Sequence, residues 1–351
     1  MKARLCLLAI LFLASVFCAP LLAQENSSAQ ENSSPAKKRD WSFSAQGKFG
    51  TRLAAYKEIV WAKRKFDDER YKLSELIYEV MPAFYTGLDL SVSYKRFSLS
   101  FLNKIFFSGK TGTLKDSDWR NDDFCSNGDT FTKTDYSEHT LYLSDKYAVL
   151  AGYDLELQAD FKFHPTRFLT LAPLISVNAQ WMTFSAQDGT GWYGNYDKNA
   201  RRIMPSSNVF SRIVYSFDGQ KVLDYDVYNF FLWTGIRADF SIRSWLNISL
   251  STEISPVSFF MDFDKHLTNE RDFKENALSL CYAFRQTVKA EFKIKENFSI
   301  CQTCVFVMSG ESEGAMYYKK STEEDYTRLL NNTGGGQIIY LDLELSAKFS
   351  W

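Results

Sequence analysis

The amino-acid sequence predicts an all-β fold, a ten-stranded antiparallel transmembrane β-barrel with long extracellular loops. Several segments alternate apolar and polar residues with a period of two, which is the pattern of strands whose two faces meet different environments. The chain has 30 Phe, 19 Tyr and 8 Trp, yet beyond residue 23 no apolar run reaches the ~18 residues that a membrane-spanning helix needs. Aromatic richness without a spanning helix favours a barrel whose outer surface meets lipid.

The first forty residues are set apart by composition. Residues 1–23 begin with Lys2 and Arg4, continue as an apolar run and end at the small residue Ala23, so we predict a secretory signal peptide. Residues 24–40 repeat the letters QENSS and contain no apolar residue larger than Ala. Such a segment cannot bury enough surface to order itself, and we interpret it as a flexible leader. Residues 41–351 are left as a single barrel domain.

The clearest strand pattern closes the chain, from Ile339 to Trp351. Every second residue is apolar, and the residues between are polar, with Asp342, Glu344 and Lys348 among them. A two-residue period places these sets on opposite faces of a strand. An apolar face opposite a charged one fits a lipid-facing exterior and a polar lumen. The same alternation recurs in residues 88–93 and 246–254.

Short and long connections alternate along the chain. The predicted tight turns are 94–96, 164–167, 243–244 and 295–297. The predicted long hydrophilic loops are 62–70, 109–136, 186–208, 264–276 and 309–336. This alternation defines ten strands with every long loop at one rim, and outer-membrane barrels place that rim outside the cell.

Charge and cysteine content narrow the functional classes. A formal net charge of -1 gives no reason to expect a nucleic-acid partner. Four cysteines follow the signal peptide, namely Cys125, Cys281, Cys301 and Cys304. The three-residue offset of Cys301 and Cys304 points their side chains to opposite faces of a strand, so we interpret them as wall residues rather than a redox or zinc motif. The sequence leaves the disulfide pairing open.

Two acidic motifs lie far apart in the chain, Asp116-Ser117-Asp118-Trp119 and Asp264-Lys265-His266. Asp264 and His266, two residues apart on a strand end, share a face and can form a carboxylate–imidazole pair. Such a pair can take a proton from water. If the two rims converge, Asp116 and Asp118 face this base across a water molecule. Asp116, Asp118, Asp264 and His266 also make a plausible metal-ligand set, so that alternative stays open.

A third motif is Thr134-Asp135-Tyr136-Ser137-Glu138-His139. Ser137 and His139 share a strand face and, with Asp135, could form a serine-type nucleophile. The chain has 3 His, and His164 falls in a tight turn at the opposite rim. His266 is therefore the preferred base.

Together these motifs resemble the omptin family of ten-stranded outer-membrane endopeptidases. The resemblance implies that Asp116 and His266 hold the nucleophilic water, that Asp264 pairs with His266, and that Asp118 assists the tetrahedral intermediate. It assigns Ser137 and His139 a supporting role. Two further acids, Asp262 and the Glu58 of Glu58-Ile59-Val60-Trp61, match the residues that receive a basic substrate side chain. The implied partners are peptides or proteins with basic residues and the lipid of the outer membrane.

The chain also departs from the family pattern. The fifth-strand segment Asn178–Ala186 lacks the family's Glu-x-Arg element, which helps bind the lipopolysaccharide that these enzymes need for activity. The sequence therefore leaves a lipid activator open without matching its binding motif, and we expect no other cofactor. Lys133 and Thr140 replace the Trp and Pro that flank the third motif. A non-catalytic adhesin or receptor is the competing hypothesis. A diffusion porin is a weaker one, because side chains largely fill a barrel this narrow.

Overall fold

The fold is taken from a computed structural model that describes residues 40–63, 70–120, 137–144, 146–194, 196–197, 202–203, 212–279 and 282–351. The predicted signal peptide, and the leader up to residue 39, lie outside the described residues. So do Cys125, Cys281 and the segment Thr134–Tyr136. Within the described part of the chain, no helix is long and apolar enough to span a membrane.

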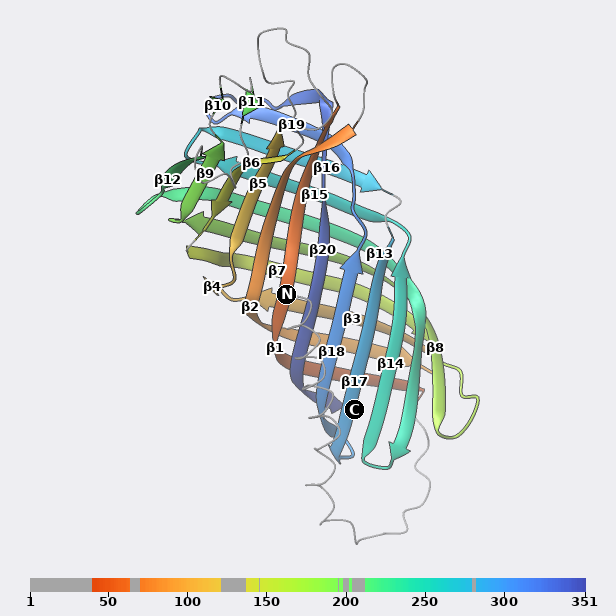
Figure 1. The fold of residues 1–351 in the computed structure, drawn as a ribbon. Helices are drawn as coiled ribbons and strands as arrows, with labels where there is room; N and C mark the ends of the chain where they lie inside the picture. Colours follow the sequence, from red (N-terminus) through yellow and green to blue (C-terminus); the bar gives the residue numbers. More distant parts are fainter. Residues whose placement is uncertain are drawn as a thin grey trace, which may run out of the picture.

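The described residues form strands and their connections (Figure 1). The first half of the chain contains β1 (Trp41–Lys63), β2 (Arg70–Tyr94), β3 (Phe97–Phe106), β4 (Gly109–Lys110), β5 (Leu114–Arg120), β6 (Ser137–Leu143), β7 (Lys146–Phe161), β8 (Leu169–Gln187), β9 (Thr190–Gly194), β10 (Tyr196–Asp197) and β11 (Arg202–Ile203). The second half contains β12 (Arg212–Ser216), β13 (Lys221–Arg243), β14 (Leu246–Ser255), β15 (Ser258–His266), β16 (Arg271–Ser279), β17 (Ala283–Lys295), β18 (Phe298–Ser309), β19 (Gly314–Lys320) and β20 (Thr327–Ser350).

Ten of these strands close a ring within the described residues. The order is β1-β2-β3-β7-β8-β13-β14-β17-β18-β20, and every neighbouring pair is antiparallel. Closure comes from β20 against β1, which pair without interruption from Ser44↔Ser350 to Ala62↔Asn332. The predicted ten-stranded antiparallel barrel is thereby confirmed. Closure matters physically because it leaves no unpaired sheet edge.

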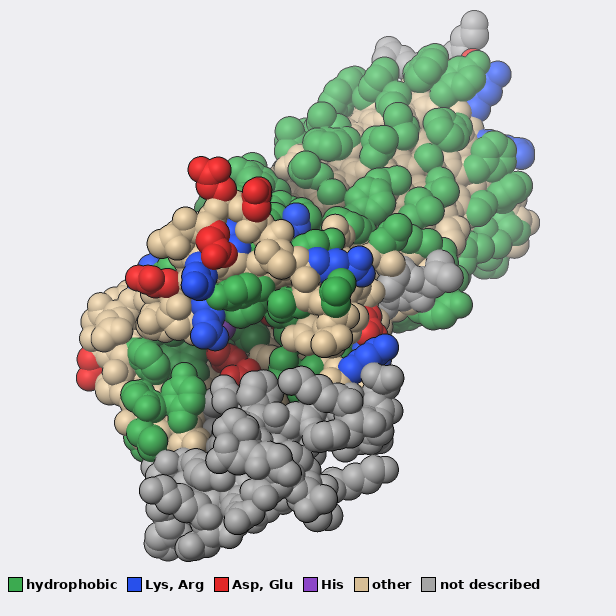
Figure 2. Space-filling model, turned by 90° about the horizontal axis from the view of Figure 1, so that it is seen from above, with side chains coloured by type: hydrophobic (Ala, Val, Ile, Leu, Met, Phe, Trp, Pro, Cys, Tyr) green, Lys and Arg blue, Asp and Glu red, His purple; other side chains and the backbone are tan. Residues whose placement is uncertain are grey.

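The inside and outside of the wall follow the predicted alternation. On β20, Leu345 is 56% exposed and Phe349 is 51% exposed, whereas Asp342 and Glu344 are buried inside the ring. Exposed large apolar side chains cover the outer face of the lower barrel, among them Trp41, Phe43, Leu90, Phe101, Leu157, Ile175 and Ile236. Figure 2 shows this apolar exterior in green. A surface of this kind matches lipid rather than water.

The tight turns lie where the sequence places them, but four of the long loops are shorter than predicted. Segment 264–276 contains the end of β15 and the start of β16, segment 309–336 contains β19, segment 109–136 contains β4 and β5, and segment 186–208 contains β9, β10 and β11. Apart from β10 and β11, these strands extend the wall above the apolar belt, where the outer face no longer meets lipid and the inner face includes the buried acids Asp262 and Glu275. Polar and apolar side chains are mixed on both faces of these strands, so the alternation that marks a lipid-facing strand is weak.

The interior of the barrel is layered. In the half of the barrel that ends in the tight turns, called the lower half here, a polar cavity of about 580 Å³ is lined by residues such as Lys48, Asp160 and Lys348. Above it, Arg52 is fully buried and pairs through Nε with Asp342 at 2.7 Å and through Nη2 with Asp154 at 2.7 Å. A layer of packed aromatic side chains follows, comprising Tyr56, Tyr78, Tyr147, Phe184 and Tyr225. This layer forms the floor of the upper compartment.

Candidate active site

A hydrogen-bonded Asp–His pair lies at the end of β15. The alternation of this strand points Asp262, Asp264 and His266 into the ring, and His266 Nε2 lies 2.6 Å from Asp264 Oδ2. Asp264 is 1% exposed, whereas the His266 side chain is 22% exposed and thus open to solvent on one side. The His266 ring also packs edge-on against Phe273 at 5.3 Å between ring centroids. With Nε2–H donating to Asp264, Nδ1 is left to accept a proton.

The electrostatic surroundings of His266 are strongly negative. Burial alone would lower the pKa of the imidazole, but the charge of Asp264, its hydrogen bond, and the charges of Asp116 and Asp118 raise that pKa to about 9. The two carboxylates predicted to face the histidine therefore lie close enough to interact with it.

Asp116 and Asp118 come from β5, which is hydrogen-bonded to β2 with Asp116 opposite Leu76 and Asp118 opposite Ser74. The core residue Leu114 fixes the inward face of β5, and a two-residue period places Asp116 and Asp118 on that same face. Burial, and next the charge of Asp118, raise the pKa of Asp116 to about 8, although His266 acts in the opposite direction. A carboxyl with such a pKa can hold a proton near neutral pH.

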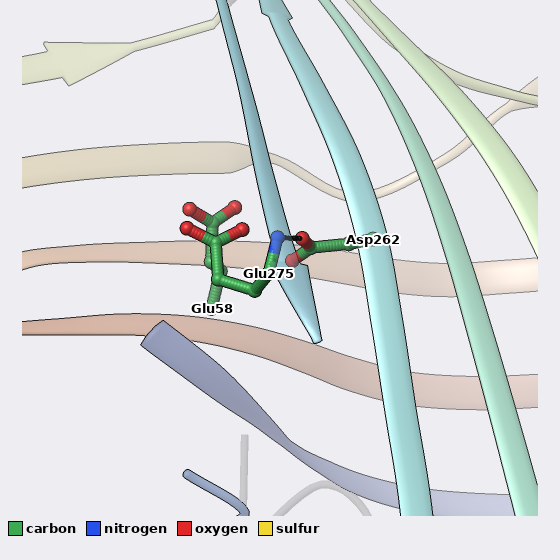
Figure 3. Close-up of side chains that lie close together, drawn as sticks. All are labelled: Glu58, Asp262 and Glu275. Carbon is green, nitrogen blue, oxygen red and sulfur yellow. Dashed lines mark hydrogen bonds between the residues drawn. The ribbon is translucent and has the colours of Figure 1, made fainter. Parts of the chain in front are cut away.

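A second acidic group lies in the upper compartment, formed by Glu58 on β1, Asp262 on β15 and Glu275 on β16 (Figure 3). All three are at least 98% buried, with exposures of 2%, 0% and 0%. Asp262 accepts hydrogen bonds from the Tyr225 hydroxyl at 2.9 Å and from the Glu275 backbone N–H at 2.8 Å. Glu58 and Asp262 are the predicted pocket acids, and the structure brings them together.

Glu275 was missed by the sequence analysis. It fell in segment 264–276, which was interpreted as a loop, so no inward face was assigned to it. The signal that could have found it is the alternation Phe273, Glu275, Ala277, in which two apolar residues flank an acid with the same strand phase. Burial is the main cause that raises the pKa of Glu58 and of Glu275 well above the usual value, and the neighbouring carboxylates raise both further. Burial also raises the pKa of Asp262, to about 6.

The third motif is only partly described. β6 begins at Ser137 and pairs with β5, so that Ser137 lies opposite Arg120 and Glu138 opposite Trp119. This register places the backbone of Ser137 and His139 beside the strand that carries Asp116 and Asp118. The side chains of Ser137 and His139, and residue Asp135, lie outside the described part of the structure. Their supporting or nucleophilic roles stay predictions.

The four residues of the metal-ligand set left open by the sequence interact electrostatically, but in the part of the chain that the structure describes no three of them have ligand atoms within 4.8 Å of one another. Among the described residues, carboxylate or imidazole ligand atoms within 4.8 Å of one another occur in Glu58, Asp262 and Glu275, not in the set of Asp116, Asp118, Asp264 and His266. The fifth-strand segment Asn178–Ala186 lies in β8, where Asn178 and Gln180 point inward and donate to Asp154. That segment is therefore engaged in the lumen network.

Fold and site together define a ten-stranded β-barrel with an Asp–His pair and clustered carboxylates at the end opposite its tight turns, which is called the wide end below. The solved structure of outer membrane protease OmpT from Escherichia coli has the same fold: the TM-score is 0.73, with 13% identity over 88% of this chain and 97% of that one. Two other solved barrels are too distant to support an argument. The translocator domain of autotransporter NalP from Neisseria meningitidis has a TM-score of 0.31 and 6% identity, over 86% of this chain and 88% of that one. The toluene transporter TbuX of Ralstonia pickettii has a TM-score of 0.28 and 9% identity, over 87% of this chain and 89% of that one. No family model matches the sequence, and no curated protein matches it significantly.

Proposed function

We propose that this protein is an outer-membrane endopeptidase that cleaves peptide bonds beside basic residues by means of an activated water molecule. The observation that carries the proposal is the 2.6 Å hydrogen bond between His266 and the buried Asp264, in electrostatic contact with Asp116 and Asp118. In Figure 2 a small patch of acidic side chains lies in a recess of the face that is seen from above, and further acidic side chains stand on the surface around it. The shared fold with a protease supports the same function.

The proposed chemistry is general-base hydrolysis. A water molecule between Asp116 and His266 gives a proton to Nδ1 of His266 as its oxygen attacks the scissile carbonyl carbon. Asp264 stabilises the imidazolium that forms, because its carboxylate accepts the Nε2–H. Asp118 assists the tetrahedral intermediate, which collapses as His266 returns the proton to the leaving amine. The proton taken from water thus ends on the leaving amine, and His266 is neutral again.

Specificity for basic residues rests on Glu58 and Asp262. Two buried carboxylates without a described cationic partner favour a guanidinium or ammonium group through charge-assisted hydrogen bonds. Because Asp262 and Asp264 share one face of β15, a substrate side chain held by Asp262 lies close to the hydrolytic pair. Substrates with Arg or Lys at the cleavage point are therefore expected.

The lower barrel carries the lipid-matching surface and the wide end carries the hydrophilic strands, so we place the wide end and its site outside the cell. A non-catalytic adhesin would present the same exterior. The buried Asp264–His266 pair favours the enzyme, because an adhesin needs no histidine of raised pKa within a ring of carboxylates.

The decisive experiment incubates refolded protein with a peptide that contains paired basic residues. Wild-type protein should cleave it, and the His266→Ala variant should lose at least a hundredfold in kcat/KM. Heat modifiability on gel electrophoresis controls for folding of the barrel. A folded His266→Ala variant within a few fold of wild type, or a wild type inactive on every basic peptide, would reject the proposal, and the latter result would favour the adhesin.

A further inference from the structure

The cluster of Glu58, Asp262 and Glu275 holds more negative charge than its surroundings neutralise. Both carboxylate oxygens of Glu275 and the Oε2 atom of Glu58 lack a hydrogen-bond partner in the described structure, although these side chains are almost fully buried. Among the described residues, no Lys or Arg forms an ion pair with any of the three acids. Buried charges without partners are costly, so a cluster of this kind needs a cation or protons.

The backbone is shaped to accommodate Glu275. A Cβ atom at Gly334 on β20 would overlap with Cγ of Glu275 and would lie 2.8 Å from its Oε1. Gly334 thus leaves the space into which the Glu275 carboxyl extends. Figure 3 shows the carboxyl groups of Glu58 and Glu275 lying close together beside Asp262. Glu58 and Glu275 therefore present unpartnered carboxylate oxygens to each other, within reach of Asp262.

The three acids can reach a single cation. One oxygen from each acid lies within 4.8 Å of the others. Mg²⁺ demands near-ideal octahedral geometry and usually keeps several of its waters, whereas Ca²⁺ takes about six to eight oxygen ligands in a flexible arrangement. A cluster of three protein carboxylates therefore favours Ca²⁺. Carboxylate oxygens are the ligands that a hard divalent cation prefers.

We propose that Glu58, Asp262 and Glu275 form a calcium site. Each acid supplies at least one oxygen, and water completes the coordination shell. One consequence rests on the proposed function: because Glu58 and Asp262 are also the acids that receive a basic substrate side chain, Ca²⁺ and substrate compete for them. Calcium then acts as an inhibitor that raises KM and leaves kcat unchanged.

The binding test needs no proteolysis. Refolded full-length protein in zwitterionic detergent without lipopolysaccharide is titrated with CaCl₂ in a calorimeter. One site per chain is expected, with weaker binding of MgCl₂. Glu275→Gln, which keeps the shape of the side chain, should weaken Ca²⁺ binding at least tenfold. The matched control is Glu296→Gln, in an exposed turn at the opposite rim, which should bind as wild type does.

Two further variants distinguish failure of the calcium site from failure of the proposed endopeptidase activity. His266→Ala should lose cleavage but retain calcium binding. If Glu275→Gln does not fold, Gly334→Ala tests the same site, because its methyl group displaces the Glu275 carboxyl. Absence of calcium binding in wild type, or binding unchanged in both Glu275→Gln and Gly334→Ala, would overturn the site. Calcium binding that leaves KM unchanged would overturn the competition alone.

Discussion

At the scale of single residues, function depends on how burial and charge act on a few side chains. Asp264 is enclosed and accepts a hydrogen bond from His266, while the imidazole keeps one side open to solvent. The raised pKa of His266 has a direct consequence: at neutral pH the imidazole is largely protonated and cannot act as a base. The pH at which it loses its proton should therefore govern activity.

The first prediction concerns Asp264→Asn. Despite burial, the charges of Asp264, Asp116 and Asp118, with Asp264 contributing most, raise the pKa of His266 to about 9, so wild-type kcat/KM should increase between about pH 7 and 9. Removing the charge lowers that pKa and shifts the rising limb toward lower pH. The maximal rate should fall at least tenfold, because the imidazolium loses its partner. The pH profile of kcat/KM measures both effects, and an unshifted limb would assign the ionisation to another group.

The second prediction concerns Tyr225→Phe. The hydroxyl donates to Asp262 at 2.9 Å and so stabilises the ionised carboxylate. Without it the pKa of Asp262 should rise further, and KM for a basic peptide should increase several fold near pH 6. Raising the pH to 8 should restore KM, because Asp262 is then ionised in both proteins. A defect that is independent of pH would instead indicate lost packing.

At the scale of elements, the inner layers of the wall separate the site from the lower lumen. The Arg52 guanidinium is bidentate on Asp342, and Lys104 Nζ lies 2.6 Å from Asp342 and 2.6 Å from Glu344. Together with the aromatic floor, this network ties β1, β3, β7 and β20 across the interior. It fills the barrel rather than lining a channel, which argues against a diffusion porin.

The third prediction tests this network. Arg52→Ala leaves Asp342 and Asp154 without their buried partner, which typically costs about 3–5 kcal/mol. The temperature at which the barrel loses heat modifiability should therefore decrease markedly. The control Arg243→Ala removes an exposed arginine in a tight turn and should change stability little. Equal stability of both variants would mean that the Arg52 network contributes nothing beyond packing.

At the scale of the whole molecule, the two halves of the barrel have opposite electrostatic character. The lower lumen pairs its charges, as in Arg285 with Glu156 at 2.6 Å. The upper compartment contains Glu58, Asp262 and Glu275, for which no ion pair with Lys or Arg occurs among the described residues. Stability is thereby concentrated in the lipid-facing half, while the upper half retains unfavourable charge for binding. Such a division is usual where a binding site is built on a rigid scaffold.

The fourth prediction concerns the pH dependence of stability. Folding raises the pKa of Asp116 from 3.8 to about 8 and that of Asp262 from 3.8 to about 6, so each stabilises the folded state less as pH rises from 4 through those values. The contribution of His266 is complete below pH 6.5 and is lost as pH rises through 9. All three effects have the same sign. Melting temperature should decrease from pH 5 to 9, and Asp116→Asn should flatten that decrease.

Much of the fold could be predicted because local pattern and local environment agree in the lower barrel. The alternation around Asp342 and Glu344 predicted the inward face of β20, and the tight turns predicted the strand count. Prediction failed above the apolar belt, where β16 and β19 do not face lipid and the polar composition of β16 resembles that of a loop. Glu275 was missed for this reason.

The sequence by itself determined the closed ten-stranded wall, the inward phase of Asp262, Asp264 and His266, and the motifs that could carry hydrolysis. Those features follow from a two-residue period and from residue type, which are local properties. Only the tertiary structure decided that Asp116 interacts with His266, that Glu275 joins Glu58 and Asp262, and that Gly334 leaves room for it. Contacts between distant strands depend on the register around the whole ring, and no local pattern encodes that register.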